Sequence, residues 1–351
     1  MELATGLGRV PRVSAALSLS TGAELLHGTA PPTCQLPVRT YQGMAGFAAR
    51  LLTIPFSHRK LSARLGALGL DAAICAMPGP LDLLMSRALR RARIPSVVVV
   101  HDATLHPGDG LPFQMHLQRR LLREADALVV LTEHVARGLR EQGAIGAGTD
   151  RRPLFMASLP PLVFGPPPLP PGAHGGRLRL LSFGRLLPYK GLDLLAEAMR
   201  LLGPSTDFEL RVVGSGPESA ALAALRALST VRVENRWVPE EGVGDLLAWA
   251  DAIVLSHREA SQSGVAAAAL AARRWVVATR VGGLAEQLAS VPTARLCEPD
   301  PASLAAAIKS LRQNPPPAEG FDPNPGSAWQ DVAARLVSGI ERELLGGRAE
   351  S

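Results

Sequence analysis

Short apolar runs alternate along this chain with longer segments in which apolar residues recur at helical spacing. The apolar runs predict β-strands over residues 13–20, 72–77, 96–100, 127–131, 178–183, 209–213, 231–234, 252–255, 275–279 and 295–297. The segments of helical spacing predict helices over residues 81–91, 112–124, 135–142, 192–202, 265–272, 301–311 and 329–345. Strands that alternate with helices in this way predict an α/β fold built on doubly wound parallel sheets.

Two proline-rich segments, 160–176 and 314–326, interrupt the alternation. Prolines at this density cannot join the interior of a sheet and favour stiff, extended chain. We therefore predict two Rossmann-like domains that face a cleft, with a last helix that is a candidate to cross back to the first domain. The predicted parts are an N-terminal domain over 1–165, a linker over 166–177, a C-terminal domain over 178–325 and a final helical segment over 326–351.

Length and composition narrow the class of protein. A chain of 351 residues with 47% hydrophobic residues can bury two domain cores and is not a disordered protein. No apolar run approaches the roughly 20 residues of a membrane helix, and the N-terminus shows no secretory signal. The three distant cysteines give neither a disulfide framework nor metal-ligand spacing. We therefore expect a cytoplasmic protein.

The charge is concentrated in one half of the chain. The first 170 residues hold 18 Lys and Arg against 11 Asp and Glu, whereas the remainder holds 19 against 20. A basic half is suited to an anionic membrane, an acidic substrate or nucleic acid, or it is only a solvated, Arg-rich surface. We expect no nucleic acid, because no aromatic-interleaved basic motif or zinc finger is present. Peripheral contact with the inner face of the cell membrane stays open.

The segment from Ala252 to Glu286 carries the clearest binding pattern. A predicted strand leads into a polar turn, and Ser and Gln residues then precede an Ala-rich helix. Ligands of parallel α/β sheets sit at the carboxyl ends of the strands, where free amides and helix N-termini favour anions. A carboxylate, Glu259, stands beside this anion site, where it is out of place unless it holds hydroxyl groups. The combination indicates a phosphorylated sugar.

Five segments of the second half make the chain similar to a known family: FGRLLPYKGLDLL, VVGSGP, NRWVPEEGVGDLLAWADAIVL, EASQSGV and VATRVGGLAEQ. They resemble the donor-binding domain of glycosyltransferase family 4, which has the GT-B architecture. The first half resembles that family more loosely, through VVVVHDATLHPGD and ADALVVLTEHVARGL. The resemblance implies a retaining, metal-independent transferase that uses a nucleoside diphosphate sugar as its donor substrate and needs no cofactor.

Arg185 and Lys190 flank a short loop that follows a predicted strand. A diphosphate leaving group gains negative charge as the glycosidic bond breaks, and two cations can stabilise that charge without a metal ion. The matching positions in the family bind the donor diphosphate. The alternative is a pair of solvated cations at the start of a helix, although a cation gains nothing from that end of the helix dipole.

The resemblance also implies further donor-binding residues. Glu259 matches the first carboxylate of the family motif E-x7-E, which holds sugar hydroxyls, whereas Ala267 stands where the second carboxylate commonly holds the ribose. Trp237 is either a core residue, which the sequence favours, or a stacking platform. Pro217 interrupts the dinucleotide motif that two nearby glycines would otherwise suggest. The donor-binding candidates are Arg185, Lys190, Gly214, Gly216, Trp237, Val238, Ser263, Gly264, Val265 and Glu286.

His101 and Asp102 follow a predicted buried strand in the first half, where the family places a histidine beside the donor sugar. An imidazole there can donate to a sugar hydroxyl and shield a developing positive centre, or it is only a capping residue. With Glu259, these two residues are the predicted catalytic residues. His106 and Asp109 either contact the acceptor or shape their loop. A zinc site formed by His101, Asp102 and His106 is the weakest alternative, and we expect no metal.

Together these features predict a hexosyltransferase of polysaccharide or glycoconjugate biosynthesis. Its acceptor would be a sugar, a lipid-linked molecule or a glycoconjugate, which the sequence does not identify. Ala267 keeps open a non-catalytic, nucleotide-sugar-binding or scaffold protein on the same fold. Another GT-B enzyme, such as an epimerase, is the third alternative.

Overall fold

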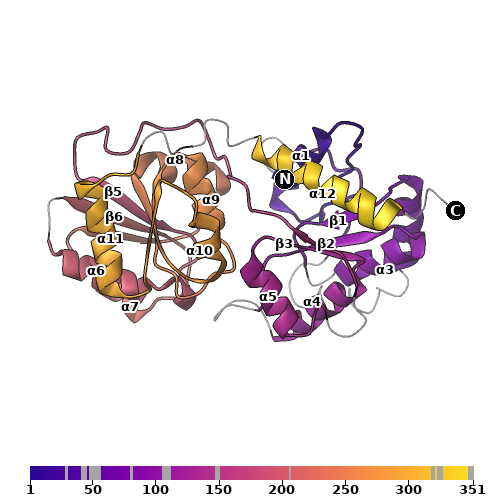
Figure 1. The fold of residues 1–351 in the computed structure, drawn as a ribbon, viewed down its shortest axis with the longest axis horizontal. Helices are drawn as coiled ribbons and strands as arrows, with labels where there is room; N and C mark the ends of the chain where they lie inside the picture. Colours follow the sequence, from indigo (N-terminus) through magenta and orange to yellow (C-terminus); the bar gives the residue numbers. More distant parts are fainter. Residues whose placement is uncertain are drawn as a thin grey trace.

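Two parallel β-sheets, each in its own lobe, organise the chain (Figure 1). The computed structural model describes residues 1–27, 31–40, 46, 57–79, 82–104, 112–146, 151–204, 207–317, 321 and 327–346. Every strand pair in both sheets is parallel. The predicted α/β fold with two Rossmann-like sheets is therefore confirmed.

The first sheet has the order β1-β2-β3-β4. Its strands are β1 (Ala73–Cys75), β2 (Ser96–Val100), β3 (Ala127–Val130) and β4 (Leu154–Met156), and the helices that follow the first three are α3 (Asp82–Ala92), α4 (Pro112–Glu124) and α5 (Glu133–Glu141). The residues of β2 and β3 are buried throughout. Strands that are apolar on both sides need helices on both faces of the sheet.

The helix α12 (Ala328–Ile340) supplies the second cover of this first sheet. Its Leu336 and Ile340 pack against Val97 and Val129 of β2 and β3, so this helix lies on the N-terminal lobe (Figure 1). The first helix, α1 (Glu2–Gly8), packs against α12 in turn. A Cβ atom on Gly6 would lie 2.6 Å from the backbone oxygen of Trp329, so this helix pair requires glycine there.

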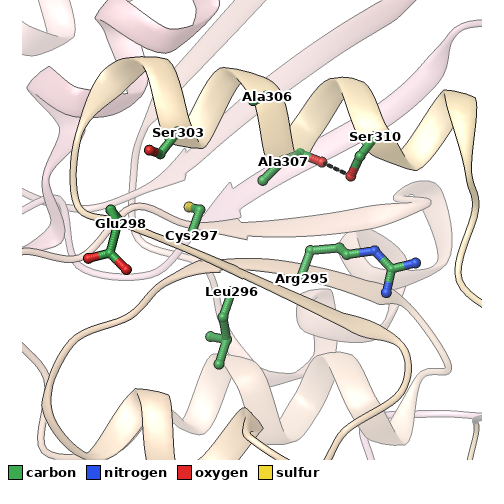
Figure 2. A pocket seen from close by; sticks show the side chains of 8 residues that line it. All are labelled: Arg295, Leu296, Cys297, Glu298, Ser303, Ala306, Ala307 and Ser310. Carbon is green, nitrogen blue, oxygen red and sulfur yellow. Dashed lines mark hydrogen bonds between the residues drawn. The ribbon is translucent and has the colours of Figure 1, made fainter.

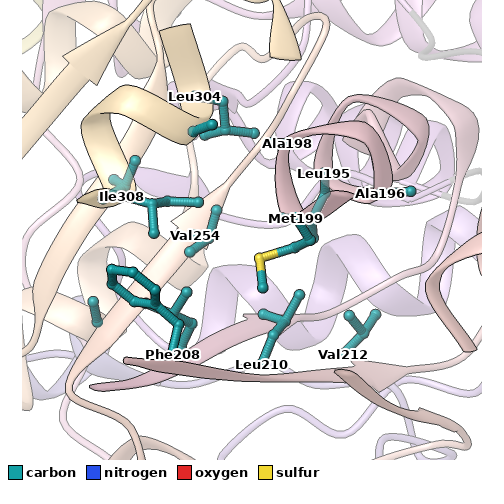
Figure 3. Packing of buried hydrophobic residues seen from close by; sticks show 14 of the residues in the cluster. Leu195, Ala196, Ala198, Met199, Phe208, Leu210, Val212, Val254, Leu304 and Ile308 are labelled. Atoms are coloured by element: carbon teal, nitrogen blue, oxygen red, sulfur yellow. The ribbon is translucent and has the colours of Figure 1, made fainter. Parts of the chain in front are cut away.

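The second sheet has the order β10-β9-β8-β5-β6-β7. Its strands are β5 (Leu178–Phe183), β6 (Phe208–Gly214), β7 (Val231–Asn235), β8 (Ala252–Leu255), β9 (Trp275–Thr279) and β10 (Ala294–Cys297). Its helices are α6 (Leu192–Leu202), α7 (Ala220–Arg226), α8 (Val243–Trp249), α9 (Gly264–Ala271), α10 (Gly282–Leu288) and α11 (Pro301–Gln313). On one face, Met199 of α6, Leu210 of β6 and Ile308 of α11 join one apolar cluster (Figure 3). A second cluster joins α8, α9 and α10 to the other face.

The strand order of the second sheet reverses at β5, which pairs with β6 on one side and with β8 on the other. The helices after β5 and β8 therefore leave the sheet on opposite faces, as the two apolar clusters show. Between them, the loops at the carboxyl ends of these strands open a crevice of the kind that binds ligands in open α/β sheets.

The proline-rich linker is tied to the second lobe by two buried charged residues. Asp251, at the start of β8, accepts hydrogen bonds from the backbone N–H of Gly172 (2.7 Å) and from Nε2 of His174 (2.8 Å). Arg274 is 1% exposed and donates to the backbone oxygens of Ala250 and Leu169. The linker is thus held at the amino ends of the strands, on the side opposite to the crevice.

Most predicted elements are confirmed to within a few residues, but the predicted strand over 13–20 is wrong. The structure has one isolated bridge there, between Ser20 and Val38, and the neighbouring residues 14–16 are exposed. The sequence analysis also missed α1 and β4. The latter has three residues, of which two are half-buried and one is exposed, so it lacks the long apolar run by which a strand is found.

Candidate functional site

The crevice at the strand-order reversal is formed by the loop after β5 and the loop after β8, which are bound to each other. The hydroxyl of Ser256 donates to the backbone oxygen of Lys190 (2.9 Å), and the backbone N–H of Arg258 donates to the backbone oxygen of Tyr189 (2.8 Å). Gly191 has a left-handed φ of 62°, and a Cβ atom there would lie 2.0 Å from the Ser256 oxygen. The two loops therefore form one rigid unit.

Arg185 and Lys190 both lie next to the Tyr189 ring. The Arg185 guanidinium donates to the Tyr189 hydroxyl (3.1 Å), and Lys190 Nζ lies 5.2 Å from the centre of the ring. Tyr189 is 6% exposed, so its ring is a fixed support rather than a mobile side chain. The residues that line the small hollow between the loops are Ser182, Phe183, Arg185, Leu186, Lys190, Leu192, Val254, Leu255, Ser256 and His257. The two predicted diphosphate-binding cations are thus brought together.

His257 is a site residue that the sequence analysis did not single out. It is 2% exposed, and Lys190 Nζ lies 2.8 Å from its Nε2. The Thr279 hydroxyl donates to the His257 backbone oxygen (2.6 Å) and ties this loop to β9. In the sequence, His257 is one member of a polar turn. Its position two residues after a buried strand was the only signal available.

Glu259 lies two residues beyond His257 on the same loop, at an exposed position outside the lining of the hollow. Between them, the exposed Arg258 forms an ion pair with Asp193 of α6, and its hydrogen bonds lower the pKa of that carboxyl. The structure thus brings Arg185 and Lys190 into one hollow, whereas Glu259 does not line it.

Gly214 and Gly216 are explained by contacts within the protein. A Cβ atom on Gly214 would lie 1.7 Å from the Gly184 oxygen, and one on Gly216 would lie 2.3 Å from the Leu186 oxygen. The Asn235 side chain both accepts from the Gly216 N–H (3.1 Å) and donates to its oxygen (3.0 Å). These glycines let the loop after β6 pack against the loop that carries Arg185.

Trp237 is 68% exposed, so the expectation that it is a core residue is wrong. It follows β7 in a loop where the adjacent Val238 is half-buried and packs on the apolar cluster of α8, α9 and α10. Val238 anchors this loop, and the Trp237 indole is left facing solvent. A stacking role for Trp237 therefore stays a prediction.

The N-terminus of α9 carries the predicted residues Ser263, Gly264 and Val265. The Ser263 hydroxyl accepts from the Ala266 N–H (3.2 Å) and so caps the helix. The Gln287 side chain accepts from the Ser263 N–H (2.9 Å) and donates to its oxygen (3.1 Å). Gly264 is exposed and Val265 is half-buried. The residue in place of the second family carboxylate, Ala267, is 1% exposed.

In the first lobe, His101 reaches the second lobe. Its Nε2 lies 2.7 Å from the Ala76 oxygen, and its Nδ1 lies 3.4 Å from the Gln262 amide nitrogen. A backbone oxygen only accepts, so Nε2 carries the proton and Nδ1 accepts. Asp102 is half-buried, and its backbone oxygen accepts from the Gln118 side chain. His106 and Asp109 lie outside the described residues.

Glu286 joins the two lobes. Its carboxylate accepts from the backbone N–H of Glu133 (2.7 Å), in the first turn of α5, where a helix favours a negative charge. Nearby, the Thr132 hydroxyl donates to the Ser261 oxygen (3.0 Å). Helices α5 and α10 lie side by side at this junction (Figure 1). The structure thus gives Glu286 a contact between lobes, and its predicted role in donor binding stays a prediction.

A larger hollow of about 410 Å³ lies elsewhere, between the edge strand β10 and α11 (Figure 2). Burial raises the pKa of Cys297, which lines it, to about 11, so the thiol is protonated at neutral pH. The Ser310 hydroxyl donates within its own helix to the Ala307 oxygen (2.7 Å). The charged residues that line the hollow, Arg295 and Glu298, point away from one another (Figure 2). We therefore do not assign this hollow as the site.

Within the described residues, no helix combines the length and the apolar character that a membrane crossing requires. The same residues contain no group of three or more His, Cys, Asp or Glu side chains placed to hold a metal ion.

Comparison with protein families covers both lobes. Residues 177–314 match the family described as glycosyl transferases group 1, and residues 15–151 match a glycosyl transferase 4-like domain. A curated relative, glycogen synthase of Mycobacterium tuberculosis, is 30% identical over 245 residues, which are 64% of this chain and 56% of the relative. The chain thus spans little more than half of that relative's length.

Two solved structures have a similar fold. Sucrose-phosphate synthase from Thermosynechococcus elongatus gives a TM-score of 0.60 at 18% identity, over 89% of this chain and 84% of that one. Anabaena Alr3699/HepE, in complex with UDP and glucose, gives a TM-score of 0.58 at 15% identity, over 90% of this chain and 86% of that one.

Proposed function

This chain belongs to the glycosyltransferase family that its two halves match, and from that premise we propose that it moves a hexosyl unit from a nucleoside diphosphate sugar to an acceptor. The observation that carries the proposal is the pairing of Arg185 and Lys190 in one hollow at the strand-order reversal of the second sheet. A planar guanidinium and an ammonium at this position suit a diphosphate. The second domain, 178–325, would then bind the donor, and the first, 1–165, the acceptor.

In the proposed reaction, the bond between the anomeric carbon and the terminal phosphate oxygen breaks, and the acceptor hydroxyl oxygen forms the new bond to that carbon. The electron pair of the broken bond stays on the diphosphate, where Arg185 and Lys190 stabilise it. Retention of configuration places the acceptor on the face from which the diphosphate leaves. A diphosphate oxygen is then the nearest base for the proton of the hydroxyl. We propose that this chemistry proceeds without a metal ion.

The remaining candidates surround the sugar in this proposal. Glu259, exposed on the loop that carries His257, would accept from sugar hydroxyls, and Ser263 to Val265 would present the N-terminus of α9 to the donor. His101 already contacts the loop that carries these residues, through Gln262. It would face the sugar from the first lobe, with Asp102 beside it. Contacts between the lobes would exclude water that could hydrolyse the donor.

Uridine diphosphate is the first nucleotide to test, because the structurally similar HepE of Anabaena was solved with UDP and glucose. Trp237, exposed at the end of β7, is the candidate to stack on the base. We propose a sugar, lipid-linked or glycoconjugate acceptor and a cytoplasmic location, with the basic first half facing an anionic surface.

One observation favours a second candidate function. Ala267 is buried where the family carries a carboxylate, so a non-catalytic protein that binds nucleotide sugars is the alternative. Calorimetry combined with product analysis separates the two. A transferase binds the diphosphate and turns the donor over, whereas a binding protein only binds it. An epimerase would instead convert the donor sugar in the absence of any acceptor.

The test is Lys190→Ala, with Lys309→Ala on the exposed face of α11 as a matched control. We expect K190A to weaken UDP binding and to lower donor turnover by roughly 100-fold, the usual scale for removing one group that stabilises transition-state charge. K309A should match the unsubstituted protein. K190A should remain folded without ligand, and its unfolding temperature should fall by no more than the loss of one partly buried hydrogen bond explains. Unchanged UDP affinity and turnover in K190A would remove the diphosphate assignment.

A further inference from the structure

The residue that contacts the Lys190 ammonium is a buried histidine. His257 is 2% exposed, and its Nε2 lies 2.8 Å from Lys190 Nζ, across 67 residues of sequence. An ammonium has three donors and no acceptor, so Nε2 must accept. The imidazole is then neutral, with its proton on Nδ1.

The surroundings hold the histidine in this position. Its backbone oxygen accepts from the Thr279 hydroxyl (2.6 Å), which fixes the loop to the end of β9. Its ring meets the buried Tyr189 ring edge-on, with centres 6.2 Å apart and planes at 63°. On the other partner, the Lys190 backbone oxygen accepts from Ser256. Both ends of the contact are therefore positioned by groups other than the contact itself.

A neutral partner suits a cation that has to bind an anion. One residue along the same loop, Arg258 is paired with the carboxylate of Asp193, which cancels its charge locally. A carboxylate on Lys190 would do the same and would also repel a diphosphate. An imidazole acceptor uses one N–H of the ammonium, directs the group and leaves its positive charge in place.

We propose that His257 is a positioning residue that directs the Lys190 ammonium toward the donor diphosphate. The proposal rests on the function proposed above, in which Lys190 binds that diphosphate. It assigns His257 a role in affinity for the phosphates and none in affinity for the nucleoside.

Two isosteric substitutions test this role. The amide oxygen of glutamine can take the place of Nε2, whereas the shorter side chain of asparagine reaches only the place of Nδ1. We therefore expect His257→Gln to retain UDP affinity within a few-fold of the parent. His257→Asn should weaken it roughly ten- to 100-fold, the range for one lost hydrogen bond to a charged group. Affinity for uridine, which lacks phosphates, should be equal in all variants.

Calorimetry on the full chain measures the affinity for UDP and the affinity for uridine. K190A is the reference variant, and His116→Asn, at an exposed position of α4, is the control. H257N with the affinity of the parent, while K190A has lost its UDP binding, overturns the role of His257 and keeps the proposed function. H257Q as weak as H257N, or uridine affinity lost together with UDP affinity, also overturns it. K190A with unchanged UDP affinity instead contradicts the proposed function itself.

Discussion

The position of Ala267 allows a direct test of why this chain departs from its family motif. The helix that carries it, α9, is buried on nearly every side: Ala266, Ala267, Ala268 and Ala269 are each at most 1% exposed. The backbone oxygen of Ala267 accepts from the Leu162 N–H (3.2 Å), so the chain leading into the linker lies against this turn. Restoring the family carboxylate by Ala267→Glu therefore adds one methylene group and one carboxyl group, whose two oxygens are polar, to a closely packed region.

The cost follows from packing and from charge. Overpacking of a well-filled core costs about 1–3 kcal/mol. Burying a carboxyl without a partner adds about 1–3 kcal/mol even when the group becomes protonated. We therefore expect A267E to lose about 2–6 kcal/mol of unfolding free energy and to gain no UDP affinity.

Urea denaturation and UDP calorimetry check this expectation. Ala224→Glu, on the exposed face of α7, is the matched control, since it adds the same side chain to a helix in contact with solvent. It should change stability by less than about 0.5 kcal/mol. An A267E variant as stable as the parent, with tighter UDP binding, would show that position 267 opens into the crevice and that the reasoning from burial is wrong.

Two further predictions concern the lobe junction and a buried thiol. Glu286→Ala removes the acceptor at the N-terminus of α5, so small-angle scattering should show a more open molecule and the KM for the donor should rise about two- to fivefold. Glu286→Gln keeps an acceptor and should stay closer to the parent in both measurements. Equal scattering for the parent and E286A would contradict a role of Glu286 in closure. Burial raises the pKa of Cys297 to about 11, above its value in the unfolded chain. The contribution of the buried thiol to stability is therefore complete below about pH 8.5 and is lost as the pH rises through 11. Cys297→Ser should flatten the fall in stability over that range, and an unchanged pH profile of stability would refute the raised pKa of this thiol.

The fold was predictable because its strongest signals are local. Runs such as 96–100 and 252–255 are buried along their whole length, and the prediction reproduced both boundaries. The failures occurred where burial is partial. Residues 13–20 alternate too weakly to form a regular strand, and β4 is too short and too exposed to be recognised before its partner β3 is in place.

The site was predictable only in part, because the residues that build it are distant in sequence. Arg185 and Lys190 could be found from their shared loop, but the contact between Lys190 and His257 depends on the pairing of β5 with β8. In the sequence, the strands β6 and β7 and the helices α6, α7 and α8 separate β5 from β8. Trp237 shows the converse error: a large apolar side chain was assigned to the core, although its neighbour Val238 does the packing. Hydrophobicity alone does not reveal which of two adjacent residues faces inward in a loop without regular period.

The same dependence on strand order explains the structural role of three glycines of this lobe. A glycine-rich turn after a strand suggests a close approach of backbone to ligand, yet Gly191, Gly214 and Gly216 each allow close approach of another protein backbone. These contacts join the loops after β5, β6 and β8 into one unit, on which the two cations are held. A Cβ atom at any of the three would first separate the loops and only then affect a ligand. Under the proposed function, these glycines would serve donor binding through the rigidity of the loops that hold the two cations.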